Sequence, residues 1–169
     1  MNVIDLSHTI TEDMPVYPGT DGPRLLPAND YVRDGFKETL LQMFSHTGTH
    51  MDPPAHLFPD GLTLDQFPVD QFIGKALVID CRGAQEGEAI TMNYLAPYGT
   101  KVAEADFLLF NLGWDKRWGT AAYFGDYPCV NDEVLDFIIN GGYKGIGFDV
   151  IGLDPIADEN LTRHKRLFS

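Results

Sequence analysis

The sequence predicts a domain of mixed strands and helices, in the α/β or α+β class, from three observations. Short apolar runs at 75–80, 106–111 and 145–149 are typical of buried strands. A helix is predicted at 131–140, because asparagine and two acidic residues begin it and two glycines follow it. The 17 glycines and 11 prolines favour a sheet with many loops over a helix bundle. The length of 169 residues fits one domain over residues 1–169.

Further elements are predicted along the chain from shorter patterns. Residues 3–6 form a brief apolar strand, and residues 37–44 form a β-compatible strand that leads into a histidine-rich segment. A turn and then a short helical segment at 63–67 follow that segment. A helix at 91–95 has threonine as its candidate cap, and a last helix begins at about residue 158.

Composition excludes several classes of partner. The net charge is 12 − 25 = −13, which argues against nucleic acid and anionic membranes as partners. The N-terminus lacks the pattern of a signal peptide, and no apolar run is long enough to span a bilayer. Cys81 and Cys129 fit no metal-binding spacing. We therefore expect reduced structural thiols in a cytoplasmic protein.

The segment 46–56 predicts a metal site. It holds three of the chain's five histidines together with one aspartate. Neutral imidazoles and carboxylates are the ligands that zinc and similar divalent ions prefer. Gly48 and Pro53 disfavour a helix here, so we expect a strand that bends at Gly48 and brings His46, His50 and Asp52 to one cation.

His56 follows the rigid Pro53-Pro54 step and has two possible roles. It is either a fourth ligand or a general base that faces a water on the metal. The alternative for all these histidines is hydrogen bonding within a buried turn. Their density beside an aspartate favours the metal.

The same segment resembles His-x-Gly-Thr-His-x-Asp-x-Pro-x-His, the signature of the cyclase family of metal-dependent hydrolases. That family includes bacterial kynurenine formamidases and isatin hydrolases. All seven specified positions match, at His46, Gly48, Thr49, His50, Asp52, Pro54 and His56. The resemblance implies a swivelling β/β/α fold, in which helices flank a central mixed sheet.

The resemblance also implies an activity. It suggests a hydrolase that cleaves an amide C–N bond of a small molecule, with water activated by Zn²⁺, or by Mn²⁺ as the alternative. His56 would be the general base, and each subunit would hold one or two ions. The expected reaction is that of an arylformamidase in tryptophan catabolism, from N-formylkynurenine to kynurenine and formate. A cyclic amide such as isatin suits the same groups. A homo-oligomer, either dimer or tetramer, is also implied.

A second metal site is less complete in this sequence. His164 lies in a segment that resembles the family's late His-x-x-Leu-Leu pattern, which implies that it joins Asp52 at a second ion. The glutamate that completes this site in the family would fall beyond Ser169. We therefore expect a domain that lacks its C-terminal strand. The alternative for His164 is a solvated residue of the last helix.

Two aromatic residues are candidates for substrate binding. Tyr17 lies in a loop that resembles the family's Met-Pro-x-aromatic-Pro-Gly loop, which implies a place in the pocket. A surface aromatic packed on Pro18 is the alternative. Trp114 follows the end of a predicted strand, where such folds often bind ligands. We expect His8 to be a buried, hydrogen-bonded histidine.

Two other functions remain open at this point. One is a metal-binding member of the same fold with weak or no activity. The other is a cupin-like protein that uses the histidine cluster to store or sense a metal. Turnover that depends on His56 separates the hydrolase from both.

Overall fold

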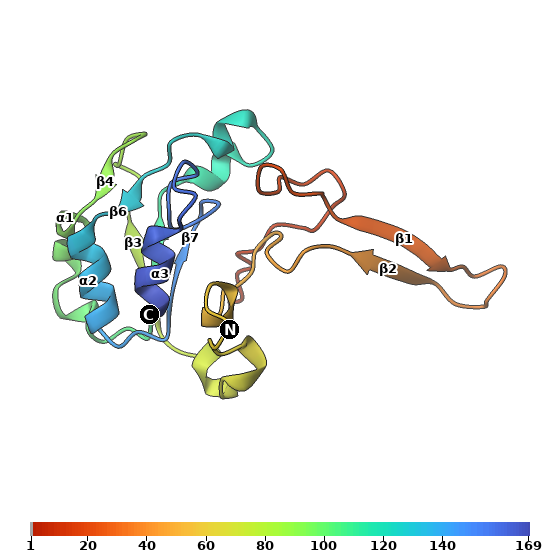
Figure 1. Ribbon diagram of the computed structural model, residues 1–169, viewed down its shortest axis with the longest axis horizontal. Coiled ribbons are helices and arrows are strands. Elements are labelled where there is room, and N and C mark those ends of the chain that lie inside the picture. The colour runs from red at the N-terminus through yellow and green to blue at the C-terminus, as the bar shows by residue number, and fades with distance from the viewer. Residues whose placement is uncertain (1) are drawn as a thin grey trace. The chain divides into compact units, whose positions relative to one another are not determined.

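The structure is a computed structural model that describes residues 2–169 (Figure 1). The strands are β1 Arg24–Asn29, β2 Glu38–Gln42, β3 Ala76–Asp80, β4 Ala89–Ile90, β5 Phe107–Asn111, β6 Cys129–Val130 and β7 Gly145–Phe148. The α-helices are α1 Met92–Leu95, α2 Asp132–Asn140 and α3 Thr162–Phe168. Short 3₁₀ helices lie at Pro54–His56, Leu64–Gln66, Val69–Phe72, Ala96–Lys101, Trp114–Arg117 and Ala121–Phe124.

The chain forms two compact units, of which the first ends at Asp52. Its only regular structure among the described residues is an antiparallel hairpin, in which β1 pairs with β2. The register shifts between Pro27 and Asn29, so the hairpin carries an irregularity near its turn. Met14 is the only buried side chain among the aliphatic and aromatic residues of 2–52, proline excepted. This unit therefore has almost no core of its own.

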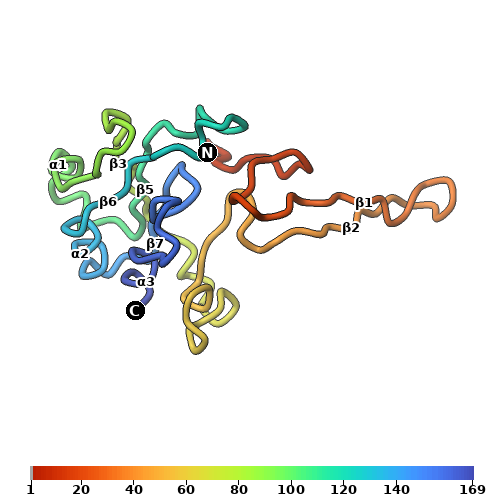
Figure 2. Tube along the Cα trace, turned by 45° about the horizontal axis from the view of Figure 1, so that its top comes forward, coloured from red at the N-terminus to blue at the C-terminus, as the bar shows by residue number. Residues whose placement is uncertain are grey.

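The second unit, Pro53–Ser169, is built on parallel strands. β3, β5 and β7 form a three-stranded sheet in the order β3-β5-β7, and Figure 2 shows the three side by side. β4 and β6 form a second parallel pair. The strands predicted at 75–80, 106–111 and 145–149 are confirmed, and so is the α/β class. Parallel and antiparallel pairings occur in separate sheets.

The core of the second unit lies around the central strand β5. Leu108 and Phe110 of β5 are fully or almost fully buried, as is Ile79 of β3. The rings of Phe110 and Phe148 stack with centroids 4.9 Å apart. β3 is not buried along its whole length, contrary to the prediction for an apolar run. Val78 is 50% exposed, because its side chain points away from the face that holds Ile79.

Helix α2 forms as predicted from its first residue to its last. The Asn131 side chain accepts a hydrogen bond from the Val134 amide at 2.9 Å and so caps the helix. Arg166 of α3 binds Asp132 and Asp136 of α2, which joins the two helices. None of the helices described in residues 2–169 has both the length and the apolar character needed to cross a bilayer.

Replacing Asn131 with alanine should lower the free energy of unfolding by about 1 kcal/mol. The amide of Val134 would lose its side-chain partner at the start of a helix that packs on the core. Thr91→Ala is the matched control, because Thr91 occupies the same capping position of α1 without a side-chain cap bond. Urea unfolding of the two variants tests this. Equal losses would contradict the capping role of Asn131.

One local prediction was wrong, and one strand was missed. Residues 3–6 form no strand, and Val3 and Ile4 are 85% and 77% exposed. An apolar run becomes a strand only where another strand supplies a hydrogen-bonding partner. No strand was predicted at β1, which contains Pro27. Proline is tolerated here because β1 is an edge strand.

Other local predictions were close. Thr63 and Gln66 form a capping box around the short helix at Leu64–Gln66. The last helix begins at Thr162 rather than at about residue 158. Cys81 and Cys129 are free and buried, as expected of structural thiols. Burial raises the pKa of the Cys81 thiol to about 12 and that of the Cys129 thiol to about 11.

Candidate metal centre

Three side chains of the first unit converge within the predicted motif. His46 Nδ1 lies 2.5 Å from Asp52 Oδ1, and His50 Nε2 lies 3.1 Å from the same oxygen. One ligand atom from each residue lies within 4.8 Å of the others. The two imidazole rings are 5.2 Å apart and perpendicular. The convergence predicted from the sequence is therefore present.

The bend that brings these side chains together occurs at Gly48. Its φ of +70° lies in the left-handed region that favours glycine. The Gly48 carbonyl also accepts from His50 Nδ1 at 2.7 Å. This bond fixes the His50 ring so that its Nε2 faces Asp52. A histidine that binds a metal usually donates its other ring nitrogen to an oxygen in the same way.

Electrostatics at the centre favour a cation. The side-chain hydrogen bond to Asp52 raises the pKa of His50 above its ordinary value. The Gly48 carbonyl raises the pKa further, whereas partial burial opposes the shift. The carboxylate and the carbonyl therefore stabilise positive charge on or beside this ring. A divalent ion would compete with that proton, so its affinity should fall at acidic pH.

Residues between the ligands complete the bend. Thr49 Oγ1 accepts a hydrogen bond from the His8 amide at 3.3 Å, which ties the N-terminal segment to the motif. Thr47 is 5% exposed, and its hydroxyl is buried without a hydrogen-bond partner. In native proteins such an atom often has an ordered water or an ion as its partner. Sequence reasoning did not single out Thr47.

The donor set fits a divalent metal ion. Two imidazole nitrogens and one carboxylate oxygen match the usual ligands of zinc, and they already lie close together. Three protein ligands also leave a position for water or substrate, as in catalytic rather than structural zinc sites. This arrangement is the fit that the motif predicted for His46, His50 and Asp52.

Gly48→Ala is expected to weaken zinc binding by about tenfold or more. Alanine at a left-handed φ costs about 1–2 kcal/mol, and each 1.4 kcal/mol is a factor of ten in affinity. Its methyl group would also lie 3.1 Å from Met14 Cε. Gly35→Ala is the matched control, because Gly35 has a φ of +77° but no atom within 4 Å of an added methyl group. Zinc titration by calorimetry would contradict the prediction if both variants lost affinity equally.

His56 lies in the second unit, at the end of the 3₁₀ helix Pro54–His56. Its amide donates to the Pro53 carbonyl at 2.9 Å, and the residue is exposed. The proline step therefore fixes the backbone of His56, as expected. Its role as general base stays a prediction.

His164 lies at the start of α3 beside a carboxylate that the sequence did not reveal. His164 Nδ1 is 2.6 Å from Asp154 Oδ2, and Asp154 is 3% exposed. The amides of Arg163 and His164 also donate to Asp154, at 2.7 and 3.0 Å. Asp154 thus holds both the helix start and the imidazole. Nothing in the Asp154-Pro155 sequence signalled this pairing.

The pKa of the Asp154 carboxyl shows which influence prevails there. Burial acts to raise this pKa, whereas the hydrogen bonds from the His164 ring and the two backbone amides together lower it by a larger amount. The net pKa lies below the ordinary value, so the carboxylate stays charged. The predicted role of His164 as a ligand of a second ion stays a prediction.

The two predicted substrate-binding residues differ in burial. Tyr17 is 43% exposed in the first unit. Trp114 is 4% exposed and belongs to the core of the second unit. Its indole Nε1 donates to the Tyr123 carbonyl at 3.0 Å, and the Arg117 guanidinium lies over its ring at 3.7 Å. Contact of either residue with a substrate stays a prediction.

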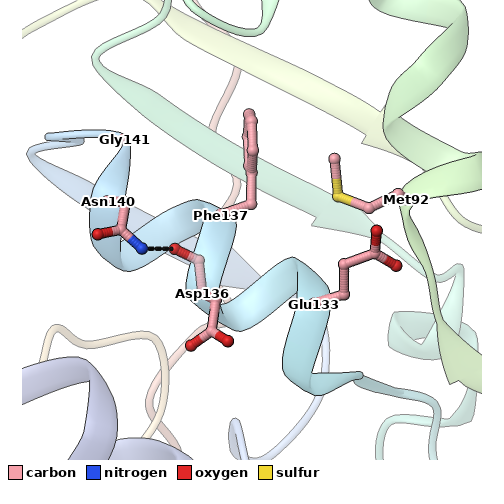
Figure 3. Close-up of a pocket in the computed structure, with 6 residues that line it drawn as sticks. All are labelled: Met92, Glu133, Asp136, Phe137, Asn140 and Gly141. Atoms are coloured by element: carbon pink, nitrogen blue, oxygen red, sulfur yellow. Dashed lines mark hydrogen bonds between the residues drawn. The ribbon is translucent and has the colours of Figure 1, made fainter.

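A surface hollow of about 470 Å³ lies along α2 (Figure 3). It is lined by Met92, Glu133, Asp136, Phe137, Asn140 and Gly141. The side-chain amide of Asn140 donates to the backbone carbonyl of Asp136 at 2.7 Å, one turn earlier in α2. None of the motif histidines lines this hollow, so it does not mark the metal centre.

Comparison with known proteins identifies the family. The family described as "Putative cyclase" matches residues 4–155, most of the chain. The chain belongs to the cyclase family. The resemblance inferred from the motif is therefore confirmed.

Relatives of this cyclase-family chain include named enzymes. A kynurenine formamidase of Erythrobacter litoralis (strain HTCC2594) is 28% identical over 173 residues, which cover 95% of this chain and 71% of the relative. A kynurenine formamidase of Bacillus thuringiensis (strain Al Hakam) is also 28% identical, over 98% of this chain and 76% of the relative. Among solved structures, isatin hydrolase A from Labrenzia aggregata, bound to benzyl benzoate, has a TM-score of 0.80 and 26% identity. The structural match covers 97% of this chain and 74% of the isatin hydrolase chain.

Proposed function

We propose that this cyclase-family chain is a metal-dependent hydrolase that cleaves an amide C–N bond. The observation that carries the proposal is the convergence of His46, His50 and Asp52 at one bend in a chain of this family. The expected reaction is that of an arylformamidase, in which N-formylkynurenine and water give kynurenine and formate. The two relatives named kynurenine formamidase support this substrate class.

The cation, when bound, would polarise a carbonyl oxygen and make water more acidic. His46, His50 and Asp52 would hold it, and the Gly48 carbonyl would fix the orientation of the His50 ring. His56 would take a proton from the attacking water and pass it to the leaving nitrogen. Water adds to the carbonyl carbon, the C–N bond breaks, and formate and an aryl amine leave.

A formylated aromatic amine suits a site with one general base. Its leaving nitrogen is conjugated with the ring, so it departs more readily than an alkyl amine, and no strong acid is needed. Tyr17 and Trp114 are our candidates for contact with the aromatic part. In the cell, this function would place the enzyme in tryptophan catabolism.

The test is formate release from N-formylkynurenine by the purified chain. We expect turnover with Zn²⁺ or Mn²⁺ present and none after chelation, with recovery when the ion is restored. Metal analysis of the active protein gives the identity of the ion and whether one or two are bound. The absence of turnover with every compound in a panel of aryl formamides and cyclic amides would overturn the proposal.

Hydrolysis of a cyclic amide such as isatin is the second candidate. The likeness in fold to isatin hydrolase A supports it. Opening of the isatin ring also breaks an amide C–N bond, but the amine and the acid remain in one product. Formate release and the loss of isatin absorbance therefore distinguish the two substrates in one assay series.

Two properties of the working enzyme are part of the proposal. We expect a homo-oligomer, either dimer or tetramer, as for the family. We also expect a cytoplasmic location, and the free thiols of Cys81 and Cys129 support a reducing compartment. Metal binding with no turnover would instead favour an inactive homologue or a storage protein.

A further inference from the structure

A second surface hollow, of about 700 Å³, lies in the second unit at the carboxyl end of the parallel sheet. Asp80, the last residue of β3, lines it, and so does Lys116 of the 3₁₀ helix that follows β5. Sheets of parallel strands commonly bind ligands outside the carboxyl ends of those strands, and hollows of roughly 300–1,000 Å³ hold small molecules. None of the motif residues 46–56 is among the described residues that line this hollow. Its place and size therefore make it a candidate binding site of its own.

One wall of the hollow is aromatic. Tyr94 of α1 and Tyr98 of the following 3₁₀ helix both line it, and both are half-buried. The two helices are continuous, because the residue that ends α1 begins the next helix. Residues four positions apart on a helical segment lie on the same side, and Pro97 completes the wall between them. A flat wall of this kind suits an aromatic ring, which packs face or edge against tyrosine.

Positive charge gathers on the opposite side of the hollow. A methyl group added at Gly113 would lie 3.3 Å from Arg82 Cγ and 4.0 Å from Lys116 Nζ, so both basic side chains lie over this glycine. Arg82 donates to Asp80 through Nε at 2.8 Å and Nη2 at 2.6 Å, which leaves Nη1 available. Lys116 forms no ion pair with any residue of 2–169. The lining therefore carries a net charge of 2 − 1 = +1, in a chain whose net charge is −13.

A further hydrogen-bond donor lies beside these cations. The Tyr98 hydroxyl oxygen accepts from the Asp80 amide at 2.7 Å. The hydroxyl proton has no acceptor among the residues that the structure describes. An anion in the hollow could therefore accept hydrogen bonds from the ammonium, the guanidinium and this hydroxyl. Hydrogen bonds that involve a charged group are about twice as strong as neutral ones.

We propose that this hollow binds a small aromatic monocarboxylate. The ring would pack on Tyr94 and Tyr98, and the carboxylate would accept from Lys116 and from the free nitrogen of Arg82. One negative charge matches the net charge of the lining, whereas a phosphate dianion would leave an excess of negative charge in an acidic chain. The proposal depends neither on the proposed activity nor on the metal centre.

Calorimetric titration of the metal-loaded chain with phenylacetate tests the ligand class. We expect saturable binding with a dissociation constant of about 1 mM or lower, as for a ligand of this size. Two analogues should bind more weakly: 2-phenylethanol, which is neutral, by about tenfold, and cyclohexylacetate, which lacks the aromatic ring, by about threefold. No saturable binding of phenylacetate, or equal binding of 2-phenylethanol, would overturn the proposal.

Variants of the lining test the place of binding. Lys116→Gln should weaken phenylacetate binding by about tenfold, and Tyr94→Leu should weaken it by about three- to tenfold. Lys75→Gln is the matched control, because exposed Lys75 receives the same change in charge just before the opposite end of β3. Unchanged binding by Lys116→Gln, or equal weakening by Lys75→Gln, would overturn the proposal.

An aromatic carboxylate could instead bind a cation at the metal centre, and His50→Ala separates the two sites. This variant should keep phenylacetate binding if the ligand lies in the hollow. Loss of binding in His50→Ala together with normal binding in Lys116→Gln would overturn the proposal. NMR of the wild type gives the same decision if a variant fails to fold. The amide signals of Gly83, Asn93 and Lys116 should shift on titration, and shifts confined to residues 46–56 would contradict the assignment.

Discussion

His50→Ala is expected to lower zinc affinity by more than 100-fold and to abolish turnover. His50 offers one of the three candidate ligand atoms, and its Nε2 lies 3.1 Å from Asp52 Oδ1. Loss of an outer-shell partner of a metal site typically costs roughly 10- to 100-fold, so loss of a ligand should cost more. Calorimetric titration with zinc and metal analysis of the purified variant measure this effect.

The control for His50→Ala is His56→Ala, which removes an imidazole from the same motif. If His56 is a base, its loss should leave the zinc content near the wild-type value. A similar fall in zinc content for both variants would instead identify His56 as a fourth ligand. Wild-type zinc binding by His50→Ala would contradict the centre described here.

His56→Ala is expected to lower kcat for N-formylkynurenine by about 100- to 10,000-fold, the range typical of general acid–base catalysis. The change should spare stability, because His56 is exposed at the end of a short 3₁₀ helix. Formate release, measured at saturating metal, gives the size of the effect.

Added imidazole provides the positive control for the His56 variant. A small base that occupies the vacated space should restore part of the rate and should not change the zinc content. A variant with normal kcat would remove His56 from the mechanism. A variant with normal zinc content, low kcat and rescue by imidazole would establish the base.

The convergence at the candidate metal centre could be predicted from sequence because its parts are local. His46, Gly48, His50 and Asp52 lie within one short segment, so spacing and backbone preference were enough to predict their convergence. The predicted strands at 75–80, 106–111 and 145–149 form one parallel sheet for a similar reason. Each is a compact apolar run between turn residues.

What the sequence did not reveal depends on distant partners. Asp154 and His164 are ten positions apart, and only the fold shows that they meet. Strand β1 depends on pairing with β2, which outweighs the local effect of Pro27. Residues 3–6 have the composition of a strand but lie exposed outside any sheet. Tertiary context outweighs local propensity at these places.

The short spacing of the metal ligands has a consequence for biosynthesis. His46 and Asp52 are six positions apart, so an ion that joins them closes a very small loop. The entropy lost on closing a loop rises with its length, and here that cost is low. The nascent chain can therefore capture its ion soon after this segment leaves the ribosome, before the strands of the parallel sheet have left it.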